Sequence, residues 1–133
     1  MNFTLSYVVI NILQLGLDGN PLSGHIPWLQ LPFMLLGEEL LSFYILLISA
    51  SLLINTKHSL LWSNLISALV FALLHVFTYW NGNIFLTLFH VLLLQGLSRL
   101  ILNTVGLRTN AVWIPWTIHI LFDIISLGLV YLA

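Results

Sequence analysis

The stretch LPFMLLGEELLSFYILLISASLL at residues 31–53 decides the fold of this chain. It is long and apolar enough to cross a bilayer as a helix, which takes about 20 residues, yet it contains two adjacent acids, Glu38 and Glu39. A charged side chain near the bilayer centre costs about 2.5–3.5 kcal/mol or more, so such acids face a protein interior and usually serve a function. A simpler alternative places both acids in the first turn of a helix, where the helix dipole favours anions.

The composition of the whole chain also indicates a membrane protein. Of its 133 residues, 60% are hydrophobic and 5% are charged, and the mean hydropathy is +1.08. Soluble domains carry about 25% charged residues, so these residues could not coat a soluble surface. The net charge of −1 offers no basic surface for nucleic acid. The lack of cysteine excludes disulfides and thiolate chemistry.

Apolar runs separated by polar or Gly- and Pro-containing stretches predict the topology. We expect an all-α protein, a polytopic transmembrane bundle of four or five antiparallel helices forming one domain over residues 1–133. Strong spans are expected at about 30–54, 60–79, 84–103 and 111–132. A weaker span is expected at about 3–17, followed by a loop or re-entrant stretch at 18–28. The connecting turns are expected at 55–59, 80–83 and 103–110.

Most polar residues within these spans recur every three or four positions, some with an aromatic residue between them, which places them on one helix face. The stripes are Glu38 with Ser42; Asn64, Ser67, Phe71 and His75; Gln95, Ser98 and Asn103; and His119, Asp123 and Ser126. Lipid offers polar groups no hydrogen-bond partners, so these faces should turn inward and bond between helices.

Position along the spans predicts which polar groups can meet. Glu38 lies about eight residues after the start of its span, and His75 about four before the end of its own. Both are therefore about 6–12 Å from loops on the same side of the membrane. The acid pair and His75 can meet, and His119 and Asp123, nearer mid-span, could approach from below.

Three motifs in this order resemble a known family. GEELLSF at 37–43 is similar to the EExxxR motif of the CAAX protease and bacteriocin-processing (CPBP, or Abi) family of intramembrane peptidases. FALLH at 71–75 matches the FxxxH motif of that family, and HILFD at 119–123 matches its HxxxN/D motif. The approach LRTNAVWIPWTIH at 107–119 is also similar. The resemblance covers about residues 30–130.

The resemblance implies a catalytic set consisting of Glu38, Glu39, His75, His119 and Asp123. Glu38 would be the general base that activates a water molecule, with His75 helping to hold it. His119 and Asp123 would stabilise the oxyanion, and Asp123 could also fix the tautomer of His119. Hydrolysis of a peptide bond needs such a base and such donors. By resemblance, the substrate would be a peptide at the membrane, and the role bacteriocin processing or self-immunity in a prokaryotic cell membrane.

A metal or a cofactor offers an alternative use of the same side chains. One Glu and two His form a known catalytic zinc set, so Glu38, His75 and His119 could hold zinc. The chain has no HExxH motif, and we favour water activation with no cofactor. A second alternative is haem held between His75 and His119, but it leaves the acid pair unexplained.

One departure from the family pattern bears on activity. The position of the motif arginine is Phe43 here, and Ser42 replaces the aromatic residue that usually precedes it. We expect Arg99 to lie about 20 Å or more from Glu38 in depth and to extend to the membrane interface, so it would not substitute. The alternative function is therefore a catalytically impaired member that acts as a membrane immunity or interaction protein. A homodimer would enlarge the small cavity wall of either form.

Overall fold

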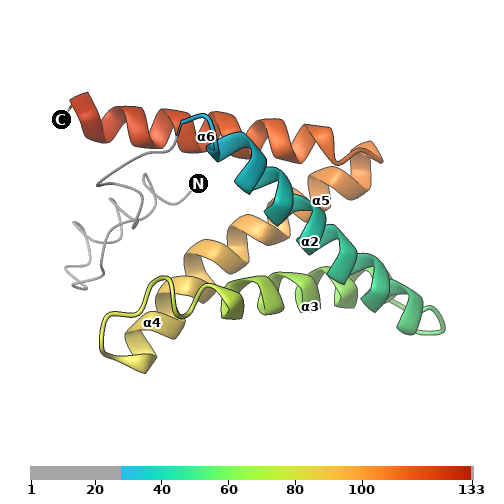
Figure 1. Ribbon diagram of the computed structural model, residues 1–133. Helices are drawn as coiled ribbons and strands as arrows, with labels where there is room; N and C mark the ends of the chain where they lie inside the picture. The colour runs from blue at the N-terminus through green and yellow to red at the C-terminus, as the bar shows by residue number, and fades with distance from the viewer. Residues whose placement is uncertain (1–27, 133) are drawn as a thin grey trace.

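A computed structural model describes residues 28–132, with side chains through residue 125. The described part of the chain is helical and contains no strand, which confirms the all-α prediction (Figure 1). Its elements are α2 (Leu31–Leu52), α3 (Ser59–Leu74), α4 (Ile84–His90), the π-helix η2 (Val91–Gly96), α5 (Leu97–Thr109) and α6 (Trp113–Leu132). The expected span at 3–17 and residues 18–27 of the expected loop lie outside the described residues.

Two of the helices within residues 28–132 are long and apolar enough to cross a membrane. They are α2, with 22 residues, and the continuous rod Ile84–Thr109 that α4, η2 and α5 form, with 26 residues. The helix α3 and the first part of α6, Trp113–Ile125, are shorter apolar helices. Large apolar side chains such as Leu47, Leu52 and Phe85 are exposed on these helices, as is expected where a helix faces lipid.

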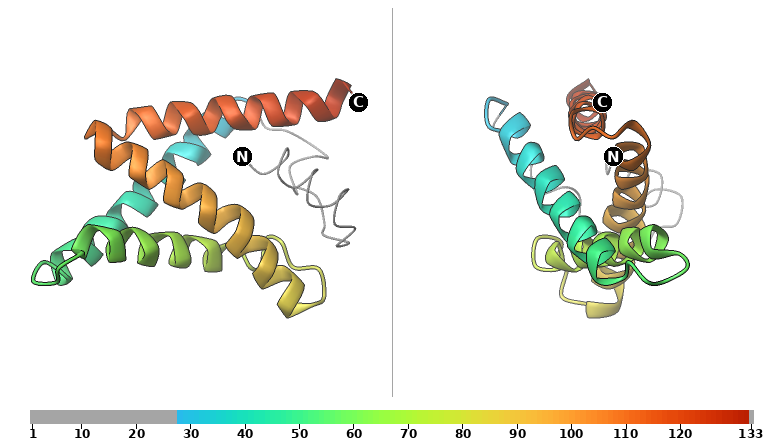
Figure 2. Two further views of the ribbon diagram at one scale, coloured as in Figure 1. Left: turned by 180° about the vertical axis from the view of Figure 1, so that it is seen from behind. Right: turned by 90° about the vertical axis from the view of Figure 1, so that its right-hand side faces the viewer.

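The helices α2 and α5 connect the two sides of the molecule. The helix α6 runs along one side and α3 along the other, and α2 and α5 cross between them (Figures 1 and 2). Each of the crossing helices packs against both α3 and α6, and the two also contact one another. Inward-facing side chains of α2, α3, α5 and α6 can therefore meet where the helices cross.

Small residues allow the close approach of η2 to α3. A Cβ added at Gly96 would lie 3.7 Å from the Cβ of Ala72 and 4.0 Å from the backbone oxygen of Ala68. Both alanines are buried. Small residues at helix contacts in membranes let backbones come together in this way. This contact fixes the π-helical segment against α3.

The rod that begins at Ile84 extends further than the sequence predicted. We expected it to end at about residue 103 and a loop to follow over 103–110, but α5 continues to Thr109. Asn103 is fully buried and bonds to other helices, so it does not mark a helix end. The helix ends at Asn110, whose φ of 51° is left-handed, a conformation that Asn tolerates better than most residues.

The helix α3 is shorter than predicted. It ends at Leu74 instead of about residue 79, and His75 follows as its C-terminal cap. The His75 backbone N–H donates to Ala72, and residues 75–79 form turns. His75 therefore lies between the end of α3 and the turns that follow it.

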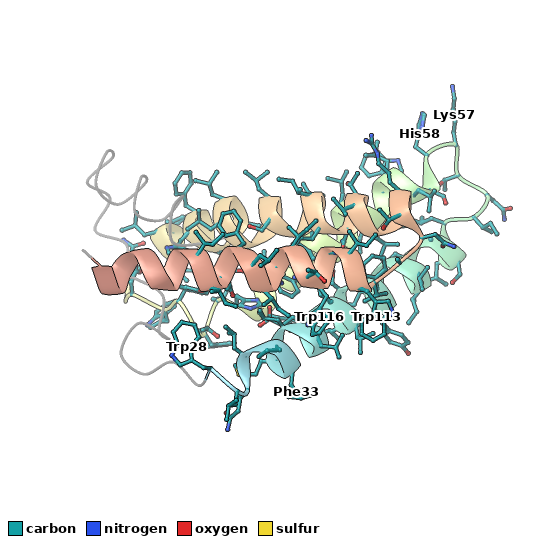
Figure 3. All side chains as sticks on the ribbon, turned by 90° about the horizontal axis from the view of Figure 1, so that it is seen from above. Trp28, Phe33, Lys57, His58, Trp113 and Trp116 are labelled. Carbon is teal, nitrogen blue, oxygen red and sulfur yellow. The ribbon has the colours of Figure 1, made fainter. Side chains whose placement is uncertain are left out.

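The helix α6 is attached to the start of α2. The Trp116 indole Nε1–H donates to the Pro32 backbone oxygen at 2.9 Å, and Trp116 packs beside Leu31 and Leu35. In Figure 3 this Trp lies between the two helices, whereas Lys57 and His58 extend from the distant α2–α3 connection. This attachment places His119, one turn further along α6, over α2.

Candidate active site

The acid pair lies well inside α2. The helix begins at Leu31, so Glu38 and Glu39 are in its second and third turns, and its first turn carries no acid. Stabilisation by the N-terminal dipole, which acts within the first turn, therefore does not explain them. Successive residues on a helix point about 100° apart. The two acids consequently enter different surroundings, although they are neighbours in sequence.

Glu38 meets His75 at the edge of the bundle. Glu38 Oε1 lies 3.9 Å from His75 Nε2, and the side chains are 33% and 19% exposed. The expectation that these two residues from α2 and the end of α3 would meet is confirmed. At 3.9 Å the groups are too far apart for a direct hydrogen bond, but both polar atoms are at a distance that one water molecule can bridge.

A backbone contact sets the orientation of His75. Its Nδ1 lies 2.9 Å from the Phe71 carbonyl oxygen one turn earlier. A carbonyl oxygen only accepts, so Nδ1 carries the proton and donates it. The neutral ring then has a bare, accepting Nε2 on the side of Glu38. The Phe71 ring packs against the imidazole, with the two ring centroids 4.5 Å apart.

Glu39 is the centre of a buried charged cluster. Its side chain is excluded from solvent and forms an ion pair with Arg99, Nη1 to Oε2, at 2.9 Å; the Arg99 side chain is 1% exposed. Its other oxygen, Oε1, lies 2.8 Å from His119 Nδ1. A carboxylate paired with a guanidinium accepts hydrogen bonds, so Nδ1 of His119 donates. The cluster joins α2, α5 and α6 through one carboxylate.

Arg99 does not lie where we expected it, about 20 Å or more from Glu38 in depth and at the membrane interface. We compared depths along helices taken to be parallel, and we expected the rod to end at residue 103. In fact α5 crosses α2 (Figure 1), and the rod continues ten residues beyond Arg99 to Thr109. Arg99 therefore lies at mid-rod and meets Glu39.

Asp123 lies on the far side of the His119 ring. Its Oδ2 is 4.0 Å from His119 Nε2, which is beyond hydrogen-bond distance. The sequence analysis gave Asp123 the task of fixing the His119 tautomer. In the structure, Glu39 makes the hydrogen bond to Nδ1 instead, and Asp123 lies near the opposite nitrogen.

A buried polar network lies one helical turn from the charged cluster. Ser42 Oγ donates to Asn103 Oδ1 at 2.9 Å, and Ser67 Oγ donates to the Ser42 backbone oxygen at 2.8 Å. Asn103 Nδ2 donates to Asn64 Oδ1 at 3.0 Å and to Ser67 Oγ at 3.1 Å. The polar faces that we expected to turn inward on α2, α3 and α5 thus meet, and their hydrogen bonds link the three helices beside the charged cluster.

Possible metal ligands are present among the described side chains. Within residues 28–125, no group of three His, Cys, Asp or Glu side chains is arranged to hold a metal ion. The zinc set of Glu38, His75 and His119, which the sequence offered as an alternative, stays a prediction. His119 Nδ1 is bonded to Glu39, and His75 Nδ1 to a backbone carbonyl.

The fold and the site define a class of protein: a helical membrane protein whose carboxylates and imidazoles, from different helices, can carry general acid–base chemistry. The chain belongs to the family of type II CAAX prenyl endopeptidases described as Rce1-like, whose model matches residues 25–125. This confirms the CPBP resemblance and indicates a membrane-embedded protease acting on a peptide. No curated protein and no solved structure matches the chain.

Proposed function

We propose that the chain is an intramembrane endopeptidase that cleaves a peptide bond near the membrane surface with a water activated by Glu38. The observation that carries the proposal is the 3.9 Å separation of Glu38 Oε1 from His75 Nε2. Both groups are partly exposed, so water and a peptide can reach them. Both atoms accept hydrogen bonds when the His75 ring is neutral, because its Nδ1–H donates a hydrogen bond to the Phe71 carbonyl oxygen.

Two acceptors on one water molecule favour nucleophilic attack. The water donates one hydrogen bond to Glu38 and one to His75. Its oxygen lone pairs are then free to attack the carbonyl carbon. As the C–O bond forms, Glu38 takes the proton and the carbonyl oxygen becomes an oxyanion. When the C–N bond breaks, Glu38 returns that proton to the leaving amine. A single carboxylate acts as base and then as acid in this cycle.

His119 is placed to stabilise the oxyanion. Its Nδ1 donates to Glu39, so an Nε2–H is present only when the ring is doubly protonated. Such a ring would lie between two carboxylates, with Glu39 Oε1 2.8 Å from Nδ1 and Asp123 Oδ2 4.0 Å from Nε2. We assign His119 as the donor to the oxyanion and Asp123 as the residue that faces its Nε2.

The cellular role follows the family by analogy. We propose a peptide substrate at a prokaryotic cell membrane, in bacteriocin processing or self-immunity, with a second copy of the chain as a candidate partner. The alternative is a non-cleaving immunity or interaction protein. The substitution at Phe43 favours that alternative, whereas the ion pair of Arg99 with Glu39 supplies a buried cation to the acid pair.

A cleavage assay separates the two. The purified full chain in lipid nanodiscs is incubated with a quenched peptide library and, in a separate arm, with prenylated peptides ending in a CAAX sequence. We expect cleavage that Glu38→Gln and His75→Gln each abolish, and that His58→Gln, in the exposed α2–α3 connection, leaves unchanged. Cleavage that survives Glu38→Gln removes the catalytic assignment. Binding of a peptide without cleavage by the unaltered chain supports the alternative.

A further inference from the structure

Arg99 is a buried charged side chain that the reaction above does not use. It is 1% exposed and forms an ion pair with a fully buried Glu39. Its guanidinium carbon lies 4.2 Å from the centroid of the Phe71 ring. A cation taken out of water and stacked on an aromatic face is held in one orientation. The residue therefore connects α5 to α2 and to the first residue of the FALLH motif.

Three contacts follow one another along the crossing of α2 and α5. Glu39 meets Arg99, and one turn later Ser42 bonds to Asn103. Next, Phe43 packs against Gly106 so closely that any Cβ on residue 106 would overlap the ring. The position where the family resemblance places an arginine is thus filled by a ring that needs a glycine opposite it. The cation reaches the acid from the other helix.

We propose that Arg99 is the positioning arginine of this site, and that it supplies from α5 the cation that the EExxxR motif carries at position 43 on α2. This inference rests on the proposed function. Arg99 neutralises Glu39 and fixes Oε2, so Oε1 stays aimed at His119 Nδ1. The orientation of the His119 ring, and with it the direction of Nε2, then depends on a residue that does not touch the substrate.

The proposal explains why position 43 does not need an arginine here. A second arginine at that position would place two guanidinium groups against a carboxylate that is already paired, at a depth where an unpaired charge is costly. Phe43 instead fills the space beside Gly106. Glu39 therefore needs one cation, which an arginine at either position 43 or position 99 can supply.

A relocation experiment tests whether either position can supply that cation. The full chain in nanodiscs is compared with Arg99→Met, Arg99→Lys, Phe43→Arg and the double variant Phe43→Arg/Arg99→Met. The matched control is Arg108→Met, because Arg108 lies on the same helix but is exposed. Two readouts are used: kcat and KM on a peptide found in the cleavage assay, and ¹⁵N NMR of labelled imidazoles, with the His119 signals assigned from His119→Gln.

We expect Arg99→Met to lower kcat about 100-fold with little change in KM, as a misplaced group does, and to shift the His119 signals. The double variant should recover at least 10-fold in kcat and restore those signals, and Arg99→Lys should recover only part. Arg108→Met should change neither readout. His119 signals unchanged by Arg99→Met, or a double variant no better than Arg99→Met, would overturn the proposal.

The NMR readout also separates this proposal from the proposed function. If the unaltered chain cleaves nothing, the proposed function fails, but the dependence of the His119 ring on Arg99 is still measured. If Arg99→Met unfolds the chain, the double variant decides the matter, because an arginine at position 43 should restore both folding and the His119 signals.

Discussion

Glu38 and Glu39 are adjacent in the chain, yet one is partly exposed beside a histidine and the other is sealed within an ion pair with Arg99. The pair is therefore two residues with different tasks. In the proposed reaction Glu38 transfers the proton, whereas Glu39 contacts Arg99 on α5 and His119 on α6. Substitution of each should separate turnover from stability.

Glu38→Gln should abolish cleavage and leave the free energy of unfolding within about 1 kcal/mol of the unaltered chain, because the side chain is partly exposed. Glu39→Gln should lower that free energy by about 3–5 kcal/mol, because it leaves the buried Arg99 cation without its counter-ion. Unfolding in mixed micelles titrated with denaturing detergent measures both. Equal losses of stability in the two variants would contradict this division.

The contact of Phe43 with Gly106 should be intolerant of a single methyl group. Gly106→Ala places a Cβ inside the Phe43 ring, so the ring or the helix α5 must shift at a cost of about 1–3 kcal/mol. The double variant Phe43→Leu/Gly106→Ala should recover part of this loss. Gly37→Ala is the control, since a Cβ there meets nothing within 4 Å. Thermal unfolding of the four proteins gives the comparison.

Asn103 should hold three helices together. It is fully buried and bonds to Ser42, Asn64 and Ser67. Asn103→Leu keeps the volume but leaves these partners unsatisfied, which should cost about 1–3 kcal/mol. Ser51→Ala is the control, because its exposed hydroxyl bonds only within its own helix among the described residues. If both variants unfold at the same detergent concentration, the network does not fix the helices.

Cleavage should not need a metal ion. The proposed reaction uses the carboxylate of Glu38 as the only base. Prolonged dialysis against a strong chelator should leave kcat within about twofold of the untreated protein, and added zinc should not increase it. The measurement needs a zinc peptidase treated in parallel as a positive control. Loss of activity that zinc restores would contradict the prediction.

The meeting of Glu38 and His75 could be predicted from the sequence. It follows from spacing and from the alternation of helix direction, and it does not require the angle between helices. The inward orientation of Ser42, Ser67 and Asn103 could also be predicted. Lipid offers polar side chains no hydrogen-bond partners, so they must point toward other helices.

The pairing of Arg99 with Glu39 could not be predicted in this way. Depth along a helix axis predicts contacts only when helices run side by side, whereas α2 and α5 cross. The polar residues at 103–110 also resemble a loop in sequence. What makes them helical is the set of partners that other helices supply to Asn103, and a single chain does not display these. The buried arginine was the missing signal, since an isolated cation in an apolar span needs an acid.

The π-helix at Val91–Gly96 determines the direction in which the side chains of α5 point about the axis of the rod. A π segment accommodates one residue more than an α-helix of the same length, and one residue corresponds to about 100° of rotation. If the same residues were wound as an α-helix, both halves of the rod would stay helical and apolar. However, Arg99, Asn103 and Gly106 would turn away from α2 together. The π-helix, which packs on α3, therefore sets the rotation that brings Arg99 to Glu39 on α2.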